Sequence, residues 1–214
     1  MPAYLIGSIG SLVETSELQR AAFNQAFSEA GLDWHWDAES YADMLRLSGG
    51  RDRIARFAES RGESVDAEAL HARKSAIFQE RLSQGGIDPR PGVSETLAAV
   101  RGEGWKTGFV STTSAANVDA VLAALGMSRD DFDVVTDSGS VTAGKPEPDV
   151  YDFALRTLGE SADGSVAVED NPDGVSAAKA AGLTCVGFPG ALHARETLAQ
   201  ADSLVDHLHP PQTA

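Results

Sequence analysis

The chain opens with a short apolar run, Ala3–Ile6, that predicts a buried strand. After this run the apolar residues recur every three or four positions, which predicts helices. Ser16 is a candidate helix cap, and the periodic positions behind it reach Ala30. Three more helical patterns follow with no strand among them, at Glu39–Leu47, Arg51–Arg61 and Asp66–Leu82. The sequence therefore predicts an all-helical block over residues 15–88.

The pattern changes after the turn-rich stretch 88–92, which reads Asp-Pro-Arg-Pro-Gly. From there short apolar strands alternate with helices. The predicted helices cover Val93–Arg101, Ala116–Leu125, Asp149–Leu158 and Val175–Ala181, and the predicted strands cover Lys106–Val110, Asp133–Thr136, Ser165–Val168 and Thr184–Gly187. This alternation predicts right-handed crossovers and a parallel, doubly wound α/β sheet.

The strand at residues 3–6 has no partner nearby in the sequence, so we expect it to join the later sheet. This placement predicts a Rossmann-like core made of residues 1–14 and 89–214, with residues 15–88 inserted as a helical cap. A chain of 214 residues is long enough for such a domain with its own core.

Composition narrows the classes of partner. The net charge of −15 argues against nucleic acid, because phosphates would be repelled. Cys185 is the single cysteine, which excludes an intrachain disulfide and favours a reducing compartment. The sequence has no signal-peptide pattern and no apolar run approaching the roughly 18 residues of a membrane span. We therefore expect a cytoplasmic protein with no membrane partner.

Polar residues gather where the predicted strands end, which is where parallel α/β sheets bind ligands. The first strand runs into GSIGS at residues 7–11, and the strand 106–110 runs into Ser111-Thr112-Thr113. A loop carries GKPEPD at 144–149, and the strand 165–168 runs into EDNPDG at 169–174. Hydroxyls with an ammonium suit a phosphate group, and adjacent carboxylates suit a hard cation such as Mg²⁺. Each motif alone would be an ordinary cap or turn, but their shared order favours a site.

Taken together, these stretches resemble the haloacid dehalogenase superfamily, in its β-phosphoglucomutase-like and CbbY-type phosphatase subgroup with a helical cap. The resemblance covers residues 1–205 and is carried by SELQRAAFN, DWHWDAESY, SGGRDRIARF, STTSAANV, GKPEPDVYDFAL and VEDNPDGVSAAKAAGL. It implies that Ser111 binds phosphate with help from Thr112, and that Lys145 balances the charges. It also implies Mg²⁺ held by Asp170, with Glu169 and Asp173 nearby.

The opening stretch departs from that family, whose first strand runs into Asp-x-Asp-Gly-Thr-Leu. Here residues 10–15 keep the end of the motif, so the nucleophilic aspartate falls on Gly7 and the acid/base aspartate on Ile9. Loss of an acid/base costs ~10²–10⁴ in rate, and loss of a nucleophile on the order of 10⁶. We expect a phosphatase fold without its chemistry, with Mg²⁺ binding weak or lost and Lys145 paired directly with Glu169 or Asp170.

Three alternatives remain. The chain is an active or weak Mg²⁺-dependent sugar-phosphate phosphatase that uses Glu14 or a metal-bound water, a purely structural or regulatory protein, or a dinucleotide-binding protein. Glu14 lies toward the cap, where we do not expect it to reach a phosphorus atom. We expect Ser8 to point to the opposite side of the chain and Ser11 to bind its own loop. GSIGS lacks the third glycine of the dinucleotide fingerprint, and its acidic ribose ligand would fall in the helical block.

In the cap, Arg51 and Arg53 lie at a predicted helix start after two glycines, and Lys74 lies on the last cap helix. These cations suit a second phosphate. The alternative is a solvent-exposed basic face. Gln19 stands where members of the resembling family often carry His, which leaves the specificity open. The expected ligand is a small phosphorylated metabolite, a sugar phosphate; no feature of the sequence names a protein partner.

Overall fold

The computed structural model describes residues 1–45, 49–192 and 194–211. Six parallel strands form one sheet in the order β3-β2-β1-β4-β5-β6. The strands are β1 (Ala3–Ile6), β2 (Lys106–Val110), β3 (Val134–Thr136), β4 (Val166–Glu169), β5 (Thr184–Gly187) and β6 (Ser203–Leu204). The strand order reverses at β1, which lies between β2 and β4. The expected α/β fold with a parallel sheet is confirmed.

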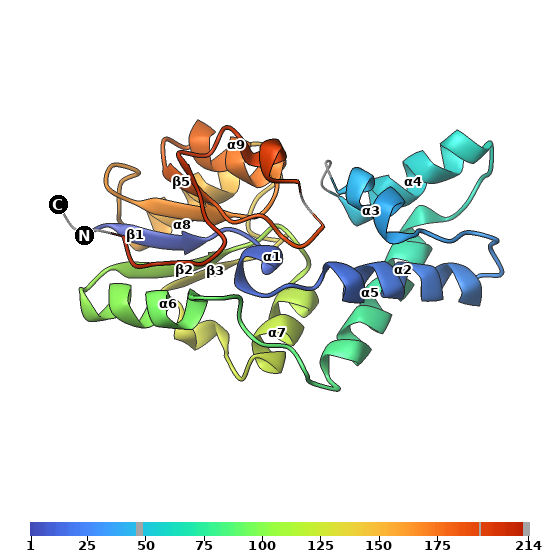
Figure 1. Ribbon diagram of the computed structural model, residues 1–214, viewed down its shortest axis with the longest axis horizontal. Coiled ribbons are helices and arrows are strands. Elements are labelled where there is room, and N and C mark those ends of the chain that lie inside the picture. Colours follow the sequence, from blue (N-terminus) through green and yellow to red (C-terminus); the bar gives the residue numbers. More distant parts are fainter. Residues whose placement is uncertain (46–48, 193, 212–214) are drawn as a thin grey trace.

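Helices cover both faces of the sheet (Figure 1). Helices α6 (Val93–Gly102) and α7 (Ala115–Ala124) pack on one face, and α8 (Asp149–Leu158) and α9 (Pro172–Ala180) on the other. The alternation of side chains along β1 makes this possible: Tyr4 and Ile6 join the first core, and Ala3 and Leu5 join the second. Because both faces of the sheet are buried, the central strand β1 is apolar along its whole length.

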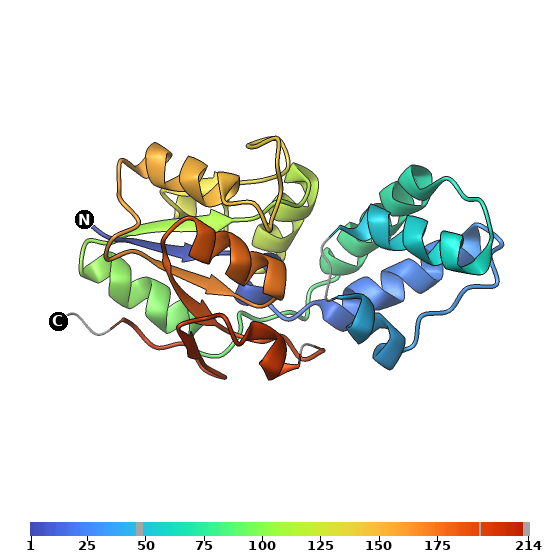
Figure 2. The ribbon, with the colours of Figure 1, turned by 90° about the horizontal axis from the view of Figure 1, so that it is seen from above.

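The remaining long helices form a lobe beside the carboxyl ends of the strands (Figure 2). They are α2 (Ser16–Glu29), α3 (Ala38–Met44), α4 (Gly50–Arg61) and α5 (Ala67–Leu82). An aromatic cluster fills the lobe, formed by Phe23, Phe27, Trp34, Trp36 and Tyr41 with neighbouring aliphatic side chains. Trp34 and Trp36 are both buried there. The predicted domain boundaries at 14/15 and 88/89 stay a prediction.

The two segments that join the lobe to the sheet lie against each other. Val13 and Pro89 form an antiparallel bridge, and the backbone N–H of Arg90 donates to the Leu12 carbonyl at 2.9 Å. The main apolar core also crosses this junction, since it contains sheet residues together with Ala26 of α2 and Phe78 of α5. The lobe is thus fixed to the sheet by backbone pairing and by shared core.

Several boundaries differ from the predicted ones. Helix α9 begins at Pro172, three residues before the predicted start, because Asn171 caps it through a 2.9 Å bond from the Gly174 N–H. The helix predicted for 39–47 ends at Met44, and residues 46 and 47 lie outside the described residues. The helix α1 (Ile9–Leu12), the 3₁₀ turns η1 (Arg129–Asp131) and η2 (Arg195–Leu198), and strand β6 were not predicted, since segments this short have no clear periodicity.

Over the described ranges, no helix has the length and apolar character needed to cross a bilayer.

Candidate active site

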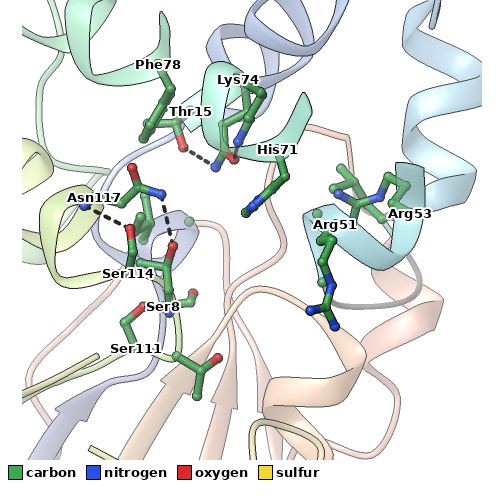
Figure 3. A pocket seen from close by; sticks show the side chains of 18 of the residues that line it. Ser8, Thr15, Arg51, Arg53, His71, Lys74, Phe78, Ser111, Ser114 and Asn117 are labelled. Carbon is green, nitrogen blue, oxygen red and sulfur yellow. Dashed lines mark hydrogen bonds between the residues drawn. The ribbon is translucent and has the colours of Figure 1, made fainter. Parts of the chain in front are cut away.

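A cavity of about 670 Å³ lies between the carboxyl ends of the strands and the helical lobe (Figure 3). Its sheet side is formed by loop residues and the first turn of α7, including Ser8, Ile9, Ser111, Thr112, Asn117 and Asp170. Its lobe side includes Gln19, Phe23, Arg51, Arg53, His71 and Lys74. The structure therefore brings seven of the predicted site positions to one cavity, namely Ile9, Ser111, Thr112, Asp170, Arg51, Arg53 and Lys74. Gly7, Lys145, Glu169 and Asp173 do not line it.

The hydroxyl cluster is held by the start of α7. Ser111 is buried at the end of β2, and its Oγ accepts the Thr113 N–H at 3.2 Å. Thr113 in turn accepts an N–H from the Asn117 side chain at 3.2 Å, and Ser114 caps α7. Within the described parts of the chain, the Ser111 hydroxyl donates to no protein group. Its proton is available for a ligand oxygen in the cavity.

Gly7 directly follows β1, and its N–H donates to the Val168 carbonyl at 2.8 Å. The space in front of its Cα is filled by other side chains. A Cβ added there would lie 2.2 Å from Glu169 Oε1 and 2.2 Å from the Tyr151 hydroxyl oxygen. A side chain at residue 7 therefore requires Glu169 and Tyr151 to move.

Glu169 is fully buried and belongs to a compact polar group beneath the cavity. Its Oε1 accepts bonds from the Lys145 ammonium at 2.5 Å and from the Tyr151 hydroxyl at 2.5 Å. Lys145 also donates to the carbonyls of Val110, at 3.0 Å, and of Gly7. Burial raises the pKa of Glu169, and the Lys145 ammonium acts against that rise. The predicted direct pairing of Lys145 with a carboxylate is confirmed; its part in phosphate binding stays a prediction.

Ser8 does not lie where we expected it. Its hydroxyl lines the cavity and donates to Asp170 Oδ1 at 2.6 Å, so the expectation that it points to the opposite side is wrong. The reason is that Ser8 caps the unpredicted helix α1, which ends the strand alternation on which the expectation rested. Ser11 contacts Ser8 Oγ at 2.8 Å within its own loop, as expected.

The three lobe cations have different surroundings. Arg53 is buried, donates from Nε to the Met44 carbonyl at 3.1 Å, and lies 5.5 Å from the centre of the Tyr41 ring. Lys74 is buried as well and donates to Gln19 Oε1 at 2.7 Å. The Arg51 side chain is 58% exposed. The alternative of a solvent-exposed basic face therefore holds for Arg51 and is wrong for Arg53 and Lys74.

The sequence profile of the haloacid dehalogenase-like hydrolase family matches residues 9–182. The chain belongs to this family. Protein CbbY of Cereibacter sphaeroides is 38% identical over 209 residues, which cover 95% of this chain and 91% of that protein. The crystal structure of CbbY from Rhodobacter sphaeroides in complex with phosphate matches with a TM-score of 0.87 and 37% identity, covering 97% of this chain and 95% of that one.

A second crystal structure of Rhodobacter sphaeroides CbbY, an aspartate-to-asparagine mutant in complex with xylulose 1,5-bisphosphate, has the same TM-score of 0.87, the same identity of 37% and the same coverage. The expected resemblance to the CbbY and β-phosphoglucomutase group is thereby confirmed. Membership in this family also disfavours the dinucleotide interpretation of GSIGS.

Members of this family are expected to use Mg²⁺, but the residues here do not fit that ion. Asp170 Oδ1 accepts bonds from Ser8 and, at 2.8 Å, from the Asn171 amide. Glu169 is committed to Lys145 and Tyr151, and Asp173 lies in the first turn of α9 away from the cavity. Among the residues described, no group of three or more His, Cys, Asp or Glu could hold a metal. Mg²⁺ usually binds through one or two carboxylates with waters and substrate phosphates, and of the three predicted ligands Asp170 alone lines the cavity, already bonded to Ser8 and Asn171.

Glu14, the substitute catalyst considered from sequence, is held elsewhere. Its carboxylate accepts the backbone N–H of Ser16 at 2.7 Å and of Ala191 at 2.6 Å. It does not line the cavity. These bonds fasten the entry to α2, so a hydrolase that uses Glu14 is disfavoured.

Three residues of the site were not identified from sequence: Tyr151, His71 and Asn117. Tyr151 fits the apolar face of α8, and helical spacing does not distinguish a core tyrosine from one whose hydroxyl has a buried carboxylate partner. His71 precedes Lys74 by three residues on α5, a spacing that places both on one helix face and could have been noticed. Asn117 is in the first turn of α7, and nothing in its sequence position distinguishes it from other residues of that helix.

Proposed function

We propose that this CbbY-like chain has lost phosphatase chemistry, wholly or nearly so, and that its cavity still binds a phosphorylated sugar. The observation that carries the proposal is at residue 7. Glycine offers no nucleophile there, and Glu169 with Tyr151 fills the space that a carboxylate would need. The carboxylate of Glu169 is itself withheld from the cavity by Lys145.

Residue 9 supports the same proposal. Ile9 packs in the main apolar core and lines the cavity, and its side chain can neither give nor take a proton. A positioned acid/base contributes ~10²–10⁴ in rate. Ser8 donates to the Asp170 carboxylate, but Ile9 supplies no acid that could protonate a sugar leaving group. Turnover of phosphate monoesters should therefore lie close to background.

Ligand binding is supported by the groups that remain. Ser111 offers a free hydroxyl proton with Thr112 beside it, and Arg53 lies on the opposite wall with Lys74. Hydroxyl and guanidinium donors are the groups that hold phosphate oxygens. The relatives named above are recorded with phosphate and with xylulose 1,5-bisphosphate, which makes a sugar bisphosphate the first ligand to try. We propose that Mg²⁺ binding is weak or lost.

The catalytic part is tested by a phosphatase screen with sugar mono- and bisphosphates, with Mg²⁺ present. The parent chain should give no turnover above background. The variant Gly7→Asp with Ile9→Asp should gain turnover, and adding Tyr151→Phe should increase the gain, because it removes the Tyr151 hydroxyl oxygen that crowds residue 7. Strong activity in the parent chain would overturn the proposal.

The binding part is tested by calorimetry with xylulose 1,5-bisphosphate and inorganic phosphate. Ser111→Ala and Arg53→Met should each weaken binding by ~10-fold or more, since hydrogen bonds to charged groups contribute about 1.5–3 kcal/mol. The matched control is Arg61→Met, an exposed arginine on the same helix as Arg53 that pairs with Glu63 outside the cavity. Absence of binding by every phosphosugar at millimolar concentration would rule the binding function out.

A further inference from the structure

Lys74 differs from the other three lysines of the chain in its partner. The others each pair with a carboxylate: Lys106 with Asp133 at 3.0 Å, Lys145 with Glu169 at 2.5 Å, and Lys179 with Asp202 at 2.7 Å. Lys74 Nζ donates to a neutral group, the amide oxygen of Gln19, at 2.7 Å. In the described part of the protein it forms no ion pair.

The surroundings of Lys74 Nζ are apolar and closed to bulk solvent. The nitrogen lies 4.6 Å from the centre of the Phe23 ring and 5.1 Å from that of Phe78, and the residue is 3% exposed. Lys74 nevertheless lines the large cavity, as Figure 3 shows. The amine therefore faces a ligand site and not the outer surface.

The charged and titratable neighbours of Lys74 also favour the neutral amine. Arg53 of α4 is the cation that opposes its charge, and His71 of α5 lines the same cavity. Burial, with Arg53 adding to it, lowers the pKa of Lys74 to about 7. Near neutral pH a large share of this side chain thus carries a free electron pair, which an ordinary lysine of pKa ~10.4 does not.

We propose that Lys74 is a carbonyl-binding lysine, which forms a reversible imine with the open-chain aldehyde or ketone of a sugar phosphate in the cavity. Desolvation in an apolar pocket beside a second cation is one way that proteins activate lysine for this chemistry. The phosphate part of the ligand rests on the function proposed above, with Ser111 on the opposite wall. The imine itself needs only the amine and a carbonyl.

The step balances without a co-reactant. The electron pair of Nζ forms a bond to the carbonyl carbon, and the C=O π electrons move to the oxygen. A proton passes from nitrogen to that oxygen to give a carbinolamine. The nitrogen electron pair then expels the hydroxyl, which takes the remaining N–H proton and leaves as water, and a C=N bond joins Nζ to the sugar carbon. Addition of water reverses each step, so the protein returns unchanged and nothing is oxidised or reduced.

The test is reductive trapping with dihydroxyacetone phosphate and sodium cyanoborohydride at pH 7, read by peptide mass spectrometry. The adduct should form at Lys74 in about tenfold or greater excess over each of the other lysines, because burial favours its neutral amine. These three lysines are internal controls in the parent chain, so the result does not depend on the folding of any variant. In Lys74→Arg, which has no amine to form the imine, the adduct at this position should disappear. Adduct spread evenly over the four lysines would overturn the proposal.

Two further probes separate this inference from the proposed function. Dihydroxyacetone has the carbonyl without phosphate, and glycerol 3-phosphate has phosphate without the carbonyl. If glycerol 3-phosphate binds and no carbonyl compound is trapped at Lys74, the carbonyl inference fails and the phosphate function stands. If dihydroxyacetone is trapped at Lys74 while no phosphate ester binds, the phosphate function fails and the carbonyl inference stands.

Discussion

At residue 7 the neighbours matter as much as the absent side chain. Glycine leaves room beside its Cα, and in this chain a buried glutamate with its lysine and tyrosine partners fills that room. The same lysine bonds the carbonyl of Gly7, so the backbone of the loop is held by the group that fills the space. This arrangement makes the residue resistant to simple replacement.

We expect Gly7→Asp to lower the free energy of unfolding by at least ~1–3 kcal/mol, the usual cost of overpacking a core. The added Cβ would lie within 2.2 Å of Glu169 Oε1 and of the Tyr151 hydroxyl oxygen. Urea unfolding without divalent cations measures the effect. Gly102→Asp is the matched control, because a Cβ there meets nothing within 4 Å. Equal stability of the two variants would show that the space is open.

Lys74 should make stability depend on pH. Because the folded state lowers its pKa from 10.5 to about 7, the unfolded chain binds more protons between these values, and the free energy of unfolding rises with pH there. Relative to Lys74→Met, the parent should gain up to roughly 4–5 kcal/mol from pH 7 to 10.5. Below pH 7 the cost of burying the ammonium is fully present. Urea titrations of both proteins at several pH values test this, and a difference in stability that stays constant from pH 7 to 10.5 would contradict it.

At the scale of elements, the sequence was sufficient for the long helices and the sheet, since periodicity reports burial directly. It was not sufficient for α1, whose four residues span barely one turn, and this omission misplaced Ser8. The site was predicted in part. The order of the strand ends was enough to predict that Ser111 and Asp170 lie at one site. Sequence spacing does not show that Glu169 packs against Gly7, or that the Tyr151 hydroxyl donates to Glu169.

One loop residue joins elements that are distant in the sequence. The Arg90 guanidinium donates to the carbonyls of Gly10 at 2.8 Å, Phe188 at 2.7 Å and Pro189 at 2.6 Å, and stacks 3.4 Å from the centre of the Phe188 ring. It thereby fastens the segment between α5 and α6 to the loops after β1 and β5.

We expect Arg90→Lys to destabilise the protein by about 1–3 kcal/mol, because an ammonium cannot reproduce the planar fork or the stacking. Hydrogen exchange should also speed up at residues 10–15 and 188–191, while the strands keep their protection. Arg101→Lys, at an exposed arginine that contacts the Asp131 carbonyl and the Phe132 ring, should leave both readouts nearly unchanged. Unaltered exchange in Arg90→Lys would mean that the guanidinium does not hold these loops.

At the scale of the whole molecule, the sheet and the helical lobe share one core. Ala22 and Ala26 of α2, with Ile77 and Phe78 of α5, belong to the same buried cluster as the strands. Gln79 of α5 also donates to the Asn117 side chain at 2.8 Å. A lobe that is bound by so much shared apolar surface should not unfold alone.

We therefore expect a single cooperative thermal transition, with equal calorimetric and van't Hoff enthalpies. Phe78→Ala should lower the midpoint of that transition by an amount equivalent to ~3–5 kcal/mol without splitting it in two. The comparison variant is Phe57→Ala, which truncates a partly buried side chain within the lobe. Two separate transitions in the parent chain would contradict the shared core.

The packing of Glu169 against Gly7 also affects how this chain can evolve. A change to a carboxylate at residue 7 would pass through a protein less stable than the present one, unless Glu169 had already turned away from Lys145. Selection would meet that loss of stability before any gain in turnover, if residue 9 must change as well. Drift alone should therefore seldom place a carboxylate at residue 7 of this chain.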